Sequence, residues 1–88
     1  MYVIEDEIHA EPQEGQFDTR AQAIAELRRR AALSWDEAPN RAPCADWRGC
    51  GRSYEVVEYD DTARPWKEFS RELVLEISAD GVRWVTDE

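Results

Sequence analysis

The chain has 88 residues, of which 20 are Asp or Glu and 11 are Lys or Arg, so its formal net charge is −9. This length suits one domain (residues 1–88) with one core, and a hydrophobic fraction of 42% argues against a disordered chain. The charge repels nucleic acids and anionic lipids, and no apolar run reaches the roughly 18 residues that cross a bilayer.

The first predicted element is a strand over residues 1–8. Tyr2, Ile4 and Ile8 fall on one face of this strand, because side chains alternate between the two faces. Asp6 is the one exception on that apolar face.

A helix is predicted after a turn or loop at residues 11–15, which contain a proline and a glycine. Thr19, with Gln22 three residues later, fits a capping box at the helix start, and the helix should end near Leu33. The predicted buried stripe consists of Ile24, Leu27 and Ala31, flanked by the small residues Ala23 and Ala32. Arginines at positions 28–30 lie where cations suit the helix dipole.

Strands are predicted at residues 53–59, in a longer segment after residue 65, and at the C-terminal end of the chain. The predicted apolar face of the long strand consists of Phe69, Leu73, Leu75, Ile77 and Ala79. Glutamates 68, 72 and 76 mark its other face.

The turn into the last strand is predicted to be a type I′ turn formed by Asp80 and Gly81. This turn would set Ile77 opposite Trp84, with Ala79 opposite Val82. We prefer it to a three-residue turn, which would set Ile77 opposite a charged residue, Arg83.

The predicted fold is therefore α+β, in the order β-α-β-β-β, with a single helix packed on one face of a roughly four-stranded antiparallel sheet. The face without the helix bears mostly charged residues. Val57 and Val74 are apolar exceptions on it, and a contact between them would allow a dimer through that face. We therefore expect a monomer or a weak homodimer.

The long helix-to-strand loop, residues 34–52, is nineteen residues without a clear period, and it holds both cysteines and two of the four tryptophans. Residues 28–52 contain six basic and three acidic residues, a basic segment in an acidic chain. Loops longer than about 12 to 15 residues are often functional. The loop is either a crossover anchored by its tryptophans or a partner-binding surface. The predicted partner-binding residues are Trp35, Arg41, Trp47, Arg48 and Arg52.

Cys44 and Cys50 are six positions apart, a spacing that fits neither a zinc ribbon nor a thioredoxin-like site. Two free thiols are the favoured interpretation, and a disulfide is the next. A zinc site would need both cysteines, His9 and a carboxylate such as Asp46, and a Cys-His nucleophile pair would also use His9. We predict no bound metal or cofactor, but a small thiol or metal site at these residues stays an alternative.

The leading hypothesis is a non-enzymatic protein-binding domain, an inhibitor or adaptor, whose partner is an unidentified protein. It would use the 34–52 loop and an acidic sheet face. The acidic residues predicted to share that face are Glu5, Asp6, Glu7, Glu55, Glu58, Asp60, Asp61, Glu68, Glu72 and Glu76. Arginines 41, 48 and 52 could instead bind phosphate or a nucleotide, or pair with carboxylates of the same loop. The N-terminus lacks the basic start of a signal peptide, so a cytoplasmic location is expected.

Overall fold

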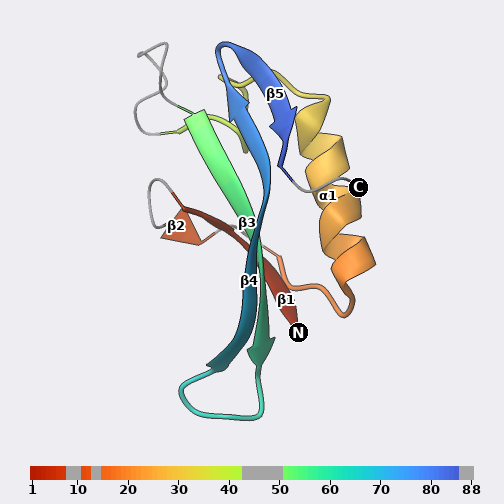
Figure 1. The fold of residues 1–88 in the computed structure, drawn as a ribbon, viewed down its shortest axis with the longest axis vertical. Helices are drawn as coiled ribbons and strands as arrows, with labels where there is room; N and C mark the ends of the chain where they lie inside the picture. The colour runs from red at the N-terminus through yellow and green to blue at the C-terminus, as the bar shows by residue number, and fades with distance from the viewer. Residues whose placement is uncertain (8–10, 13–14, 43–50, 86–88) are drawn as a thin grey trace.

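The computed structural model describes residues 1–7, 11–12, 15–42 and 51–85, which form one α-helix and a five-stranded antiparallel sheet (Figure 1). In chain order the elements are β1 (Tyr2–Asp6), β2 (Glu11–Pro12), α1 (Arg20–Ala31), β3 (Gly51–Asp60), β4 (Lys67–Ser78) and β5 (Gly81–Trp84). The predicted α+β class and the order β-α-β-β-β are confirmed. The two-residue strand β2 was not predicted, since residues 11–15 were expected to be a turn or loop.

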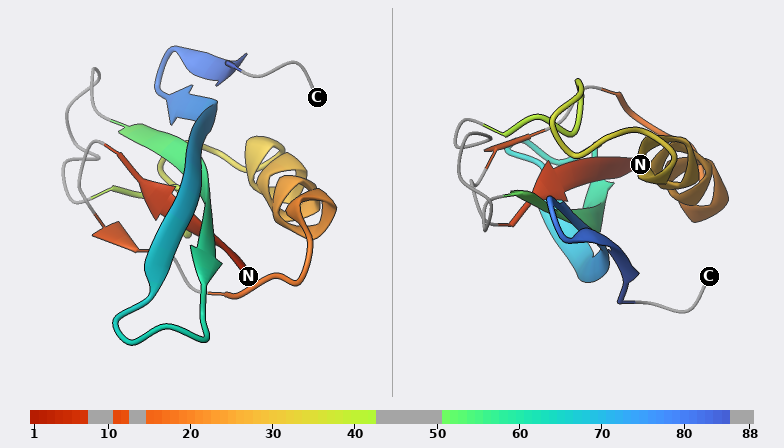
Figure 2. Two further views of the ribbon diagram at one scale, coloured as in Figure 1. Left: turned by 60° about the horizontal axis from the view of Figure 1, so that its bottom comes forward. Right: turned by 90° about the horizontal axis from the view of Figure 1, so that it is seen from above.

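The strands are arranged in the order β2-β1-β3-β4-β5, so β3 is the central strand. Both views in Figure 2 place α1 beside one face of the sheet, which we call the helix face. The core lies between α1 and this face. It consists of Ile4, Ala23, Ile24, Leu27, Tyr54, Val56, Val74, Leu75 and Ile77.

Helix α1 begins as predicted, because Thr19 is its N-cap and forms the capping box with Gln22. It ends at Ala31, two residues before the predicted end near Leu33. The predicted stripe is correct at Ala23, Ile24 and Leu27, but Ala32 is exposed. Arg30 is buried instead, with only 3% of its surface exposed, because its long side chain extends over the sheet.

Two β-bulges in β4 change which residues share a face. Tyr54 lies opposite Leu75, but the next residue of β3, Glu55, lies opposite Leu73, so Val74 is an extra residue in β4. Leu75 and Leu73 therefore lie on opposite faces, and Val74 turns into the core. The prediction that Phe69, Leu73, Leu75, Ile77 and Ala79 share one face is wrong, since each bulge interrupts the alternation. A surface contact between Val57 and Val74 is also excluded, because Val74 turns into the core and neither side chain is exposed.

The turn between β4 and β5 lies one residue earlier than predicted. Ser78 pairs with Gly81 and Ile77 with Val82, so Ala79 and Asp80 form the turn, and Trp84 lies opposite Leu75. Gly81 has φ of +123° at the start of β5, and the Asp80 backbone N–H donates to the Ser78 hydroxyl at 3.2 Å. The register differs from the predicted one by two residues, which keeps the apolar residues on the same face.

No helix among the described residues is long and apolar enough to cross a membrane.

The central position of Leu75 yields a stability prediction. Leu75→Ala should lower the free energy of unfolding by about 2 to 5 kcal/mol, because it removes a fully buried side chain from the core. Val82→Ala, at an exposed position of β5, should change it by less than about 0.5 kcal/mol. Urea unfolding of both variants measures this. An unchanged transition midpoint for Leu75→Ala would show that the core is assigned to the wrong face.

Candidate functional site

Asp6 and Arg52 form an ion pair inside the protein. Arg52 Nη1 lies 3.0 Å from Asp6 Oδ2, and the two residues are only 5% and 1% exposed. The second Asp6 oxygen accepts from the Ser53 backbone N–H at 3.1 Å, and Arg52 Nη2 donates to the Arg41 carbonyl at 2.8 Å. The pair therefore connects three parts of the chain: β1, the start of β3, and the segment around Arg41. Asp6 was the exception on the predicted apolar face. Its ion pair with Arg52 explains how a carboxylate can be buried at this position.

The structure places three of the five predicted partner-binding residues. Arg52 is engaged inside the fold, and half-buried Trp35 packs against the core. Arg41 is exposed, and its contact with Arg52 is made by its carbonyl rather than its guanidinium, so these two residues do not form an anion-binding patch. Trp47 and Arg48 lie outside the described residues.

The thiol and metal alternatives concern Cys44, Cys50 and His9, which also lie outside the described residues. These alternatives stay predictions. Within residues 1–7, 11–12, 15–42 and 51–85, no group of three or more His, Cys, Asp or Glu side chains is arranged to hold a metal ion.

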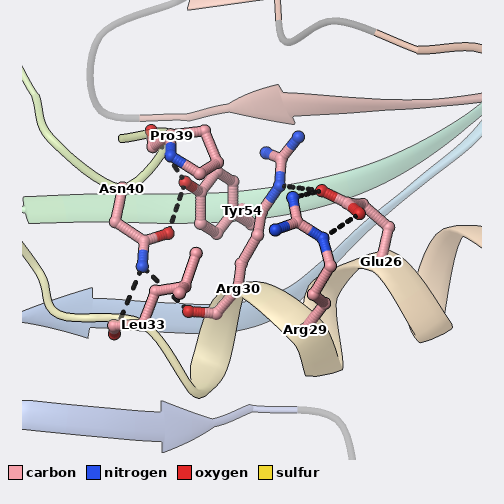
Figure 3. Close-up of polar contacts among 7 residues, drawn as sticks. All are labelled: Glu26, Arg29, Arg30, Leu33, Pro39, Asn40 and Tyr54. Carbon is pink, nitrogen blue, oxygen red and sulfur yellow. Dashed lines mark hydrogen bonds and ion pairs between the residues drawn. The ribbon is translucent and has the colours of Figure 1, made fainter. Parts of the chain in front are cut away.

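Asn40 connects the end of α1 to the central strand (Figure 3). Its amide nitrogen donates to the carbonyl of Arg30, in the last turn of the helix, at 2.8 Å and to that of Ser34, just after the helix, at 3.1 Å. Its carbonyl oxygen accepts from the Tyr54 hydroxyl at 3.0 Å. Burial is the main cause of the raised pKa of Tyr54, so this hydroxyl stays protonated and remains a donor. Sequence reasoning missed Asn40, because an Asn beside a proline is typical of any turn.

Two arginines of α1 converge on one carboxylate. Glu26 accepts from Arg29 Nε and Nη2 at 2.8 and 2.7 Å and from Arg30 Nε at 2.6 Å. These contacts, that with Arg29 above all, lower the pKa of Glu26 to about 2. Figure 3 shows the Arg30 side chain passing Tyr54, and its guanidinium carbon lies 5.1 Å from the centre of that ring.

A hollow of about 620 Å³ lies beside this group. The described residues that line it are Gly15, Phe17, Glu26, Arg29, Arg30, Ala38 and Pro39. The three charged side chains among them pair with one another, and none of these seven residues has a hydroxyl or thiol nucleophile. The one carboxylate, Glu26, has a pKa lowered to about 2, which makes it a weak base.

The face of the sheet away from α1, which we call the opposite face, is organised around Arg71. Its guanidinium lies 3.0 Å from Glu5, 2.7 Å from Glu55 and 2.8 Å from Glu68. The Tyr59 hydroxyl donates to Glu5 at 2.6 Å, and burial together with this carboxylate raises the pKa of Tyr59 to about 12. Three carboxylates around one guanidinium leave this cluster negatively charged.

The predicted single acidic face is wrong. The pairing of Glu5 with Glu55 and of Ser53 with Glu76 puts these acids on the opposite face. Asp6, Glu58 and Glu72 lie opposite Tyr54, Tyr2 and Val56, and therefore belong to the helix face. The alternation of strand residues and the bulge at Val74 divide the acids between the two faces.

The end of the β3–β4 hairpin exposes aromatic side chains. Trp66 is 41% exposed and Phe69 is 57% exposed. Trp66 contacts Tyr59, with the ring centroids 5.8 Å apart and the planes tilted by 47°. Phe69 is the extra residue of the second bulge, next to the pair formed by Tyr59 and Glu68. We call Tyr59, Trp66 and Phe69 the aromatic hairpin surface. Sequence reasoning assigned Phe69 to the core and missed Trp66.

Replacement of Asn40 tests its role in joining helix and sheet. Asn40→Ala should lower the free energy of unfolding by about 1 to 3 kcal/mol, because it removes the buried hydrogen bonds of the Asn40 amide to the Arg30 carbonyl and the Tyr54 hydroxyl. Arg41→Ala is the control, since the contact of Arg41 with Arg52 uses the backbone. Equal stability of the two variants in urea unfolding would show that the Asn40 contacts are not stabilising.

The lowered pKa of Glu26 predicts a pH dependence. A carboxyl whose pKa is lower in the folded protein stabilises the fold above its ordinary pKa of 4.5, and this contribution disappears as the pH falls towards 2. The stability difference between the parent and Glu26→Gln should therefore be largest near neutral pH and shrink between pH 4.5 and 2. Unfolding curves measured across this range, with an NMR titration of the Glu26 carboxyl, provide the test. An NMR midpoint near 4.5 would contradict the ion pairing.

No family model, no curated protein and no solved structure matches this chain.

Proposed function

We propose that this protein is a small non-enzymatic protein-binding domain, an inhibitor or adaptor, and that its partner docks on the aromatic hairpin surface. The observation that supports this best is the exposure of Trp66 and Phe69 beside Tyr59 at one end of the molecule. Large aromatic side chains that gather on a surface are typical of protein interfaces, where they supply most of the binding energy.

The aromatic hairpin surface replaces the 34–52 loop as the main docking surface in this proposal. Trp66 and Phe69 are not part of the core cluster, whereas Trp35 packs against it and Arg52 is buried in an ion pair. The side chains at the hairpin are thus available to a partner without any change in the fold. Exposed Arg41 stays a candidate contact, together with Trp47 and Arg48.

Hydrogen bonds also connect the hairpin end to the rest of the fold, and this favours binding because an anchored backbone loses less freedom on association. Tyr59 is bonded through its backbone N–H to the Met1 carbonyl at 2.8 Å and through its hydroxyl to Glu5. At the connection between the strands, the Asp60 carboxylate accepts from the Thr62 backbone N–H at 2.9 Å. These backbone and side-chain bonds suit a recognition site that is formed before the partner binds.

A capture experiment tests the proposal. The double variant Trp66→Ser with Phe69→Ser should recover about tenfold less of any specific partner from an extract of the source organism, because it removes two exposed aromatic contacts. The matched control is Val82→Ser with Val85→Ser, which removes two other exposed apolar side chains. Quantitative mass spectrometry of the captured proteins gives the ratio, and thermal unfolding confirms that each variant is folded. Equal recovery by the parent and the hairpin variant would refute the proposal.

A further inference from the structure

The outer side of β4 is open over part of its length. β5 pairs only with residues 75–78 of β4, and the Val85 backbone N–H extends this contact to the Val74 carbonyl at 2.8 Å. In Figure 1, β4 continues well past the end of β5 towards the hairpin. Among the described residues, positions 67–71 of β4 pair with β3 alone. We call the outer side of residues 67–71 the open edge. An edge of this kind presents backbone groups that another strand can bind.

The aromatic hairpin surface adjoins this edge. Trp66 immediately precedes the open edge, and Phe69 lies in its middle. A strand added here would bury part of these exposed side chains as well as pair its backbone with β4. Specificity in strand addition comes from alternate side chains of the added segment, which meet the side chains of the edge strand.

The charges beside the open edge favour a cationic partner. Arg71 is already surrounded by Glu5, Glu55 and Glu68, so this cluster has one positive and three negative groups. Glu68 keeps 45% of its side chain exposed. Phe69 offers a ring on which a guanidinium or ammonium group can rest. The net charge of −9 adds a long-range attraction for a basic partner.

The same charges disfavour a second copy of this chain as the occupant. Each copy has a net charge of −9, and in each copy the cluster beside the open edge has three carboxylates around one guanidinium. Two copies that met at this edge would therefore bring like charges together, which disfavours their association.

We propose that the open edge binds an extended segment of a partner protein that carries Lys or Arg beside apolar side chains, and that this segment adds to the sheet as a further strand next to β4. The inference rests on the proposed function and names the chemistry of the partner. The backbone of the segment pairs with residues 67–71, its apolar side chains cover Phe69 and Trp66, and its cations face Glu68.

Selection from a displayed library of short random peptides tests this without a known partner. The protein is the bait, and an unrelated protein of similar net charge is the counter-bait. Enriched peptides should contain an excess of Lys and Arg alternating with apolar residues. A synthetic copy of the most enriched peptide should slow amide hydrogen exchange at residues 67–71 by about tenfold or more.

Two pairs of variants localise the binding of that peptide. Phe69→Lys should weaken it about tenfold, whereas Val82→Lys, which adds the same charge at an exposed position of β5, should not. Glu68→Gln should weaken it by about two- to fivefold, and Asp80→Asn, which removes one charge at the distant turn, should leave it unchanged.

The possible results separate this inference from the proposed function. Peptides that need Trp66 and Phe69 but are neutral or acidic, or that leave exchange at residues 67–71 unchanged, overturn the inference and leave the proposed function standing. Peptides that bind Phe69→Lys and the Trp66→Ser, Phe69→Ser double variant as well as the parent overturn both. Absence of enrichment over the counter-bait overturns the inference. A dimer in sedimentation experiments that Phe69→Lys dissociates would show that a second copy occupies the edge, which also overturns it.

Discussion

The helix, the sheet and the segment after the helix are all held by one side chain, Tyr54. It lies on the central strand β3, opposite Asp6 of β1 on one side and Leu75 of β4 on the other, and it is fully buried. Its ring lies under the guanidinium of Arg30, and its hydroxyl donates to Asn40. An aromatic residue with a polar end suits this position. The ring fills the core, while the hydroxyl reaches the edge of the core and bonds to Asn40, which in turn bonds to the end of α1. The polar residues around it are thus buried together, and each satisfies another.

The sequence predicted the elements well where a local pattern determines them. Thr19 and Gln22 define the start of α1 because the capping box needs only residues of the same turn. The bulges at Val74 and Phe69 were missed, since an extra residue in a strand depends on its partner strand and leaves no mark in the local alternation. Arg52 was predicted to pair with carboxylates of its own loop or to bind an anion or a partner, whereas Asp6, with which it pairs, comes from a distant part of the chain. The aromatic hairpin surface was missed for a related reason, because the hydrophobic pattern alone assigns Phe69 to the core.

The charged residues have different physical roles on the two faces of the sheet. On the helix face, Asp6 and Arg52 are buried and connect elements, and the loss of either would leave an unpaired charge in the interior. On the opposite face, Glu55 is buried, but Glu5 and Glu68 beside Arg71 are partly exposed, and their interactions are weaker because water screens them. A net charge of −9 thus includes groups that stabilise the fold and groups that remain available for interactions with other molecules.

The position of β1 beside the central strand has a consequence for the order of folding. β3 and β4 are joined by a short connection, whereas β1 pairs with β3 only after the chain has closed over α1 and the whole segment between them. Closure of a long segment costs more conformational entropy and slows the contacts that depend on it. The β3–β4 hairpin is therefore expected to form early and β1 to dock late. On this pathway the ion pair between Asp6 and Arg52 is among the last native contacts to form, and the N-terminal strand is the last to become protected.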